Sequence, residues 1–142
     1  MTDASHERFG DFRLAASDIQ TAIAWIASKA IELGATQRQC FAAQLCAEEL
    51  LANAIGHGGR DLLSVAITLD VLPDRLRLTL ADDGAAFNLA AAPERAQDPS
   101  IDAAEPGGWG VALVRRFADR VDCESRDGGN VIRLDFLRGE HP

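Results

Sequence analysis

The fold is decided around residues 49–57, which read Glu49-Leu50-Leu51-Ala52-Asn53-Ala54-Ile55-Gly56-His57. Glu49, Asn53 and His57 are four residues apart, so on a helix each drifts by only about 40° from the one before it. They form one polar line on a helix that is otherwise rich in apolar residues. Burying a polar group without a partner costs about 1–3 kcal/mol. The line therefore indicates either a binding site or the solvated edge of an ordinary helix.

Two helices are predicted from capping residues and apolar periodicity. The helix that carries the polar line has Thr36 as its cap and runs to about residue 55, where it is ended by Gly56, Gly58 and Gly59. An earlier helix spans about residues 18–33, with Ser17 as its cap and Gly34 at its end.

Strand periodicity occurs on both sides of these helices. Apolar residues alternate strictly over 63–71 and again over 76–80, with a turn at Pro73-Asp74 between them, which predicts a β-hairpin with one buried face. The remaining elements are a weak opening strand at 9–15, a third helix that begins at Gly107-Gly108-Trp109-Gly110, and two last strands at 121–125 and 131–136. This order predicts an α/β (α+β) two-layer sandwich, with helices on one face of a mixed, mostly antiparallel sheet.

Composition limits the class of protein. The 142 residues include 14 Lys+Arg and 22 Asp+Glu, which gives a net charge of −8 and disfavours direct binding to nucleic acid or to an anionic membrane. The length fits a single domain over residues 1–142. The three cysteines have no metal-site spacing, and no signal peptide or long apolar run is present, so we expect a cytoplasmic protein with reduced thiols.

A second motif follows the predicted hairpin directly, and it reads Asp82-Asp83-Gly84-Ala85-Ala86-Phe87-Asn88. An aspartate that leaves a strand beside a glycine can present its carboxylate to a ligand while the backbone approaches closely. Asp-Gly is also a common turn signal, so an ordinary turn is the alternative.

A third motif is the glycine-rich start of the third helix, residues 107–110. Backbone N–H groups at such a start can converge on an anion, and the helix dipole adds positive potential. It is neither a P-loop nor a GxGxxG dinucleotide motif, and a flexible hinge is the alternative. Between the second and third motifs, about residues 84–110 have no periodicity, which is typical of a functional lid.

The three motifs in this order resemble the GHKL ATPases, and most closely the small bacterial anti-sigma-factor serine-protein kinases of partner-switching systems. The resemblance extends over nearly the whole chain, through the sequences 49–57, 82–88 and 107–119. It implies a Bergerat-type ATP-binding fold, with residues 84–110 as the ATP lid.

The resemblance also implies a role for each matching residue. Glu49 resembles the general base, and Asn53 resembles the ligand of a Mg²⁺ ion that bridges the phosphates of ATP or ADP. Asp82 resembles the carboxylate that accepts from the adenine amino group, with Gly84 allowing the base to approach. The other expected nucleotide-binding residues are His57, Phe87, Gly107, Gly108, Trp109, Gly110 and Asn130. For His57 the alternative is a structural residue.

The chain departs from its relatives at a few of these positions. Asn130 stands where relatives carry a threonine that helps to hold the adenine; it keeps hydrogen-bonding capacity but lacks the hydroxyl group. Trp109 stands where a smaller residue is common, which is consistent with a cap over the nucleotide or over a partner.

The resemblance implies a function in transcription regulation. Such a protein phosphorylates a Ser or Thr of a STAS-domain anti-sigma antagonist, and it binds a sigma factor and holds it inactive. A homodimer is expected on the same ground. The acidic charge permits a basic partner such as a sigma factor.

Three other functions share these motifs. One is a non-kinase module that keeps ATP as a structural ligand, although a pure binder needs no base at Glu49. Another is a histidine-kinase catalytic fragment, which would need a phosphoacceptor hairpin, and only five residues precede His6. The last is a hydrolytic ATPase, whose gyrase-like and heat-shock-like forms carry additional domains.

Overall fold

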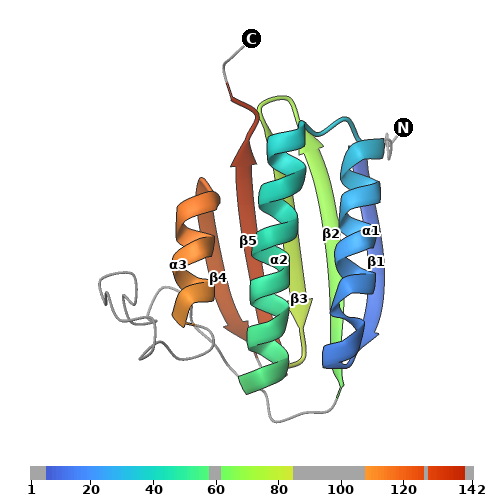
Figure 1. Cartoon of the computed structure of the whole chain (residues 1–142), viewed down its shortest axis with the longest axis vertical. Helices are drawn as coiled ribbons and strands as arrows, with labels where there is room; N and C mark the ends of the chain where they lie inside the picture. Colours follow the sequence, from blue (N-terminus) through green and yellow to red (C-terminus); the bar gives the residue numbers. More distant parts are fainter. Residues whose placement is uncertain (1–5, 58–61, 85–107, 127, 140–142) are drawn as a thin grey trace.

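The structure is a computed structural model, and it describes residues 6–57, 62–84, 108–126 and 128–139. The elements follow the predicted order (Figure 1). They are β1 (Glu7–Leu14), a 3₁₀ turn (Ala16–Asp18), α1 (Ile19–Glu32), α2 (Gln37–His57), β2 (Leu63–Leu72), β3 (Arg75–Asp82), α3 (Gly108–Phe117), β4 (Arg120–Arg126) and β5 (Gly129–Leu137).

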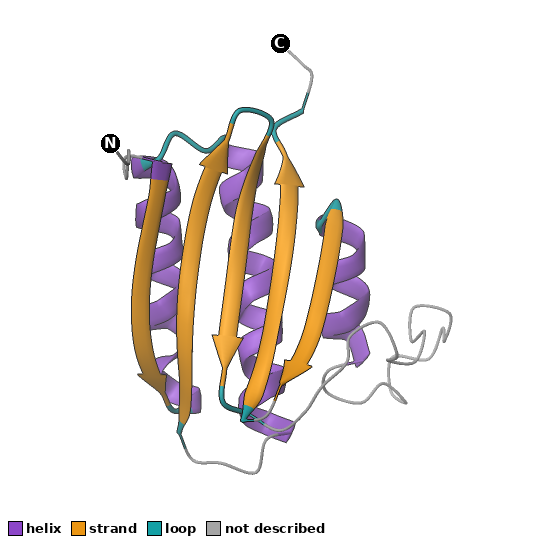
Figure 2. Cartoon of the chain, turned by 180° about the vertical axis from the view of Figure 1, so that it is seen from behind, coloured by secondary structure: helices purple, strands orange, loops and turns teal. Residues whose placement is uncertain are grey.

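The five strands form one sheet in the order β1-β2-β3-β5-β4. Every pairing between the described strands is antiparallel, so the sheet is wholly antiparallel there rather than mixed. Helices α1, α2 and α3 lie on one face, and no described element covers the other, here called the bare face (Figure 2). The predicted two-layer architecture is therefore confirmed.

The core lies between the helices and the sheet because the strands alternate in polarity. The inward side chains of the hairpin are all buried, among them Val65, Ile67, Leu69, Leu76, Leu78 and Leu80. Small residues of α2 face them, namely Ala43, Cys46 and Ala47, all fully buried, which lets the helix backbone approach the sheet. Burial, with a smaller contribution from Glu49, raises the pKa of the Cys46 thiol to about 12, so this cysteine is an apolar core residue.

The ends of the helices agree with the sequence at some residues and not at others. Thr36 caps α2 as predicted, since its Oγ1 accepts from Gln39 N at 3.1 Å and Gln39 Oε1 accepts from Thr36 N at 2.9 Å. Gly34 ends α1 with a positive φ of 90°. The Ser17 cap is wrong, because the carboxylate of Asp18 accepts from Ala15 N at 3.0 Å and forms the 3₁₀ turn instead.

Glycine does not end α2 where the sequence suggested. The helix continues through Gly56 to His57, two residues beyond the expected end. Gly56 is exposed, and an isolated glycine costs a helix about 1 kcal/mol, which the packing of the preceding turns offsets. No described helix is long and apolar enough to cross a membrane.

A buried ion cluster joins β3 and β5 on the bare face of the sheet. Asp135 is 2% exposed, and its carboxylate accepts from Arg77 Nε at 2.7 Å, from Arg77 Nη2 at 3.1 Å and from Arg75 Nη1 at 2.9 Å. The hydrogen bond from Arg77 is the main cause that holds the pKa of Asp135 below its ordinary value, although burial opposes it. The cluster thus ties the two strands together through charge-assisted hydrogen bonds.

We expect Asp135→Asn to lower the free energy of unfolding at pH 7 by about 1–3 kcal/mol, because Arg77 loses its anion and Arg75 keeps only its pairing with Asp74. Since the folded-state pKa of Asp135 is lowered, its contribution is present above the unfolded-state pKa of about 3.9 and is lost as the pH falls below it. Urea denaturation from pH 7 to pH 3 measures both effects. Asp122→Asn is the control, because Asp122 is 52% exposed and its one ion pair among the described residues is with Arg120. Equal losses in the two variants would contradict the assignment.

Candidate functional site

Four elements converge at one end of the molecule. The end of α2, the end of β3, the start of β5 and the start of α3 all lie at the lower edge of the sheet (Figure 1). The approach is close, since a Cβ placed on Gly84 would lie 3.8 Å from the carbonyl oxygen of Ala54 in α2. The topology therefore brings the first two sequence motifs together on the helix side of the sheet.

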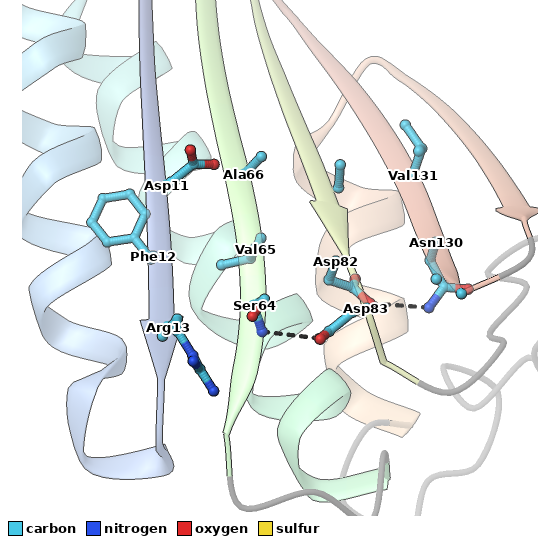
Figure 3. A pocket seen from close by; sticks show the side chains of 13 residues that line it. Asp11, Phe12, Arg13, Ser64, Val65, Ala66, Asp82, Asp83, Asn130 and Val131 are labelled. Atoms are coloured by element: carbon cyan, nitrogen blue, oxygen red, sulfur yellow. Dashed lines mark hydrogen bonds between the residues drawn. The ribbon is translucent and has the colours of Figure 1, made fainter.

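Asp82 is the last residue of β3, and its carboxylate is held by two donors. Gly84 N lies 2.8 Å from Asp82 Oδ1, and Asn130 Nδ2 lies 3.1 Å from the same oxygen (Figure 3). Within the described part of the chain no donor contacts Asp82 Oδ2. The carboxylate is thus oriented through one oxygen and leaves the other available to a ligand that donates a hydrogen bond.

Asn130 owes its place to the strand register. It is opposite Asp82 in the β3–β5 pairing and opposite Ser125 in the β4–β5 pairing, and it is 4% exposed. Ser125 Oγ donates to Asn130 Oδ1 at 3.1 Å, so the amide accepts from one neighbour and donates to the other. The Asn130 amide therefore positions the Asp82 carboxylate, although Asn130 lacks the hydroxyl group of the threonine expected at this position. Ser125 was missed in the sequence, because only the register of β4 reveals it.

Gly129 is a further residue that the sequence analysis did not select. A Cβ at this position would lie 1.8 Å from the carbonyl oxygen of Asp82, so no side chain fits there. A Cβ on Gly84 would lie 3.0 Å from Asp82 Oδ1 and 3.2 Å from Leu63 Cδ1. Gly129 is thus required by close packing against the backbone of Asp82, whereas a side chain at Gly84 would make its neighbours shift by a few tenths of an ångström.

Asp83 stabilises the same corner from the hairpin side. Its Oδ1 accepts from Ser64 N at 2.9 Å, and its backbone N donates to Ser64 O at 3.1 Å. The two adjacent aspartates therefore differ in their contacts: Asp83 closes the end of the β2–β3 ladder, and Asp82 keeps an oxygen for a ligand.

Asn53 carries an orphaned polar group on α2. The residue is 8% exposed, and its Nδ2 is buried without a hydrogen-bond partner in the described part of the chain. Leaving a buried N–H donor unpaired costs about 1–3 kcal/mol, so the position fits a ligand with a hydrogen-bond acceptor, such as the oxygen of an anion. The amide oxygen is a suitable ligand for Mg²⁺, which takes few protein ligands beside phosphates and water. No cluster of three or more His, Cys, Asp or Glu side chains within the described ranges could hold a metal alone.

Glu49 lies one turn before Asn53 and is half-buried. Burial is the main cause that raises its pKa above the ordinary glutamate value, and the negative charge of Glu48 raises it further. Glu48 contacts α1, where Gln20 Nε2 donates to its carboxylate at 3.0 Å. Only Glu49 of this pair therefore stands on the polar line as a candidate proton acceptor.

Several predicted residues cannot be placed. Phe87, Gly107 and the lid residues 85–107 lie outside the described residues. The backbones of His57, Gly108, Trp109 and Gly110 are described at the ends of α2 and α3, without their side chains. Their nucleotide-binding roles stay predictions.

A hollow of about 530 Å³ also reaches this end of the sheet, but on the bare face. Asp11, Ala66 and Val131 project into it, away from the helices (Figure 3). Parts of Asp82 and Asn130 line it, yet strand alternation places their side chains with the helices, beside Leu80 and Ile132. The candidate site is therefore on the helix side, opposite this hollow.

We expect Gly129→Ala to lower the free energy of unfolding by about 2 kcal/mol or more, because the added methyl group overlaps the Asp82 carbonyl oxygen. Gly56→Ala is the matched control. A Cβ there meets no atom within 4 Å, so a gain of about 0.5–1 kcal/mol is expected from helix propensity. Urea denaturation of both variants tests this, and a Gly129→Ala variant as stable as the wild type would refute the packing argument.

Comparisons with known proteins agree with this geometry. Residues 12–136 match the model of the histidine kinase-like ATPase domain. The serine/threonine-protein kinase BtrW of Bordetella bronchiseptica is 32% identical over 130 residues, which is 87% of this chain and 89% of that protein. The serine-protein kinase RsbW of Bacillus subtilis is 27% identical over 131 residues, 86% of this chain and 78% of that protein.

Solved structures show the same fold at lower identity. The crystal structure of the RsbU and RsbW domains of Rv1364c from Mycobacterium tuberculosis has a TM-score of 0.62 at 16% identity and covers 92% of this chain and 32% of that one. The catalytic domain of histidine kinase ThkA has a TM-score of 0.52 at 14% identity, and the match covers 92% of this chain and 97% of that one. The chain therefore belongs to the histidine kinase-like ATPase domain family, and within that family its sequence is similar to the serine-protein kinases BtrW and RsbW.

Proposed function

We propose that the chain is an ATP-dependent serine/threonine-protein kinase that phosphorylates a STAS-domain antagonist and sequesters a sigma factor. One observation carries the proposal: a carboxylate fixed through Oδ1, with Oδ2 left without a donor in the described residues, stands at the end of the sheet that also holds Asn53 and Glu49. The similarity to BtrW and RsbW supports the choice of serine or threonine over histidine as acceptor.

Asp82 is proposed to recognise the adenine of ATP or ADP. Its Oδ2 accepts a hydrogen bond from the exocyclic amino group, while Gly84 lets the base approach the backbone. A carboxylate of this orientation accepts from an amino group and repels the carbonyl oxygen that guanine carries at the equivalent position. The relay from Ser125 through Asn130 would then keep the site selective for adenine.

Asn53 is proposed to hold the metal and phosphate side of the nucleotide. Its amide oxygen would bind Mg²⁺, which when bound neutralises charge on the phosphate oxygens. The backbone N–H groups at the start of α3 are proposed to contact the phosphates, because the first N–H groups of a helix have no partner within the helix.

Glu49 is proposed to act as the base in phosphoryl transfer. The hydroxyl oxygen of the substrate Ser or Thr forms a bond to the γ-phosphorus, and the bond from that phosphorus to the β,γ-bridging oxygen breaks. The hydroxyl proton passes to the Glu49 carboxylate, and ADP leaves with the bridging oxygen. Burial, which raises the pKa of Glu49, makes it a stronger proton acceptor than an exposed glutamate.

The proposed partners follow from the family resemblance and are compatible with the charge of the chain. A net charge of −8 favours a basic surface on a sigma factor over direct contact with DNA. We propose that the protein acts in the cytoplasm, where sigma factors work, and that it does so as a homodimer.

We expect Asp82→Asn to weaken binding of ATP with Mg²⁺ by about 5- to 150-fold. The amide cannot satisfy the two donors at Oδ1 and still accept from adenine at a second oxygen, a loss of about 1–3 kcal/mol. Titration calorimetry measures the affinity. Asp122→Asn on β4 is the control, because Asp122 is exposed and remote from Asp82 in the sheet register. Unchanged affinity in Asp82→Asn would overturn the adenine assignment.

We expect Glu49→Gln to bind ATP normally and to transfer phosphate to a purified STAS antagonist at least about 100-fold more slowly. In the wild type, the rate should fall on the acidic side at a pH above the ordinary glutamate range, because protonated Glu49 cannot act as base. Labelled-phosphate transfer at saturating ATP measures both effects.

The control for this experiment is Glu48→Gln. It should keep a rate close to that of the wild type, and it should move the acidic limb to lower pH, because the neighbouring charge that raises the pKa of Glu49 is removed. Near-normal transfer by Glu49→Gln would exclude it as the base. Nucleotide binding without transfer to any STAS partner by the wild type would indicate a non-kinase binding module.

A further inference from the structure

A second hollow, of about 240 Å³, lies at the other end of the helical layer from the candidate site. It is formed where α2 begins and where α3 and β5 end, at the upper edge in Figure 1. Phe41 in its wall precedes Asn53 by twelve residues of α2, which is about 18 Å along the helix axis. A molecule bound here would leave the candidate nucleotide site open.

The wall of this hollow exposes large apolar side chains. Phe41 is 58% exposed, and its ring packs edge to face against Phe117 of α3 with the centroids 6.2 Å apart. Leu137, at the end of β5, also lines the hollow, although strand alternation places its side chain on the face opposite Phe136. The buried Phe136 and Ala42 form the floor. An exposed aromatic ring that is already fixed by a neighbour loses little side-chain entropy on binding, which is typical of an interface anchor.

Two cations stand at the rim of the same hollow. Arg38 on α2 and Arg116 on α3 are exposed, and neither forms an ion pair with any described residue. One carboxylate, that of Asp119, also lines the hollow, and its Oδ2 accepts from Leu137 N at 2.8 Å. Two guanidinium groups beside one carboxylate leave a local excess of positive charge in a chain with a net charge of −8, and this excess favours carboxylates as ligands.

We propose that this hollow, here called the upper hollow, binds an acidic segment of a partner protein. One bulky apolar side chain of the segment contacts Phe41 and Phe117, and flanking carboxylates pair with Arg38 and Arg116. The net negative charge of the whole chain attracts basic partner surfaces. The upper hollow instead binds an acidic partner surface. Its partner and the nucleotide bind at the same time, so this inference stands independently of the proposed kinase function.

The test uses a synthetic peptide in which one phenylalanine is flanked by glutamates, titrated into the ¹⁵N-labelled full chain. We expect amide signals of Phe41, Phe117 and Leu137 to shift, with a dissociation constant below about 1 mM. Arg38→Glu with Arg116→Glu, and separately Phe41→Ala, should each weaken binding by at least about tenfold. The double arginine variant changes only exposed side chains, so it remains folded and informative if Phe41→Ala is destabilised.

The controls separate charge, apolar contact and location. Arg13→Glu on β1 and Ile31→Ala on α1 change an exposed cation and an exposed apolar residue outside the upper hollow, and both should leave the affinity within about twofold. ATP with Mg²⁺ should also leave it unchanged. Equal binding of the same peptide with glutamines in place of glutamates would overturn the proposal, as would absence of binding or shifts confined to other surfaces.

Two further measurements test whether the upper hollow is occupied by a second copy of the chain or by its own C-terminal residues. If sedimentation shows that the wild type is a dimer and that Phe41→Ala is a monomer, the upper hollow is covered by a second copy and the proposal is overturned. If Glu140→Gln moves the signals of Phe41 and Phe117 in the absence of peptide, the chain's own C-terminal residues fill it, with the same consequence.

Discussion

The pairing of β5 with β3 beside Asp82 is the constraint on which the candidate site depends. The register sets Asn130 opposite Asp82, and it brings Gly129 so close to the Asp82 carbonyl oxygen that no Cβ could be accommodated. Strand β5 thus supplies both the Asn130 amide, which orients the Asp82 carboxylate, and Gly129, whose lack of a side chain lets the two strands lie this close together. If this pairing moved by one residue, the amide would face the opposite side of the sheet and Asp82 would lose its partner.

The helix side of the site retains polar groups at the expense of stability. A core of only Ala, Leu and Ile would pack α2 more favourably than one that includes the half-buried Glu49 and Asn53, whose Nδ2 has no partner among the described residues. Such groups persist where binding or catalysis needs them. The ion cluster at Asp135 differs, because each of its partners is satisfied and it lies on the bare face. Its role is to hold together the two strands that form the site.

Much of the fold could be predicted because the sequence is locally consistent. Alternation over residues 63–80 predicted the hairpin, and Thr36 and Gly34 marked helix ends by simple capping chemistry. Ser17 was a wrong cap, because Asp18 competes for the same turn and nothing in the local sequence decides between them.

The site was predictable from the sequence only in part. Its three motifs were visible, but Gly129, Ser125 and the Asp135 cluster depend on which residues face each other across strands. Arg77 and Asp135 are 58 residues apart in the chain, and only the antiparallel register makes them neighbours. The role of Asn130 was likewise decided by position, since its amide reaches both Ser125 and Asp82.

The most direct test of the account is a crystal structure of the full chain with Mg²⁺ and a non-hydrolysable ATP analogue. The account predicts the adenine amino nitrogen at about 2.8–3.2 Å from Asp82 Oδ2, with Oδ1 still bound to Gly84 N and Asn130 Nδ2. It also predicts the Asn53 amide oxygen among the ligands of the metal. An adenine bound in the hollow on the bare face, or a nucleotide that leaves Asp82 Oδ2 and Asn53 without contacts, would contradict it.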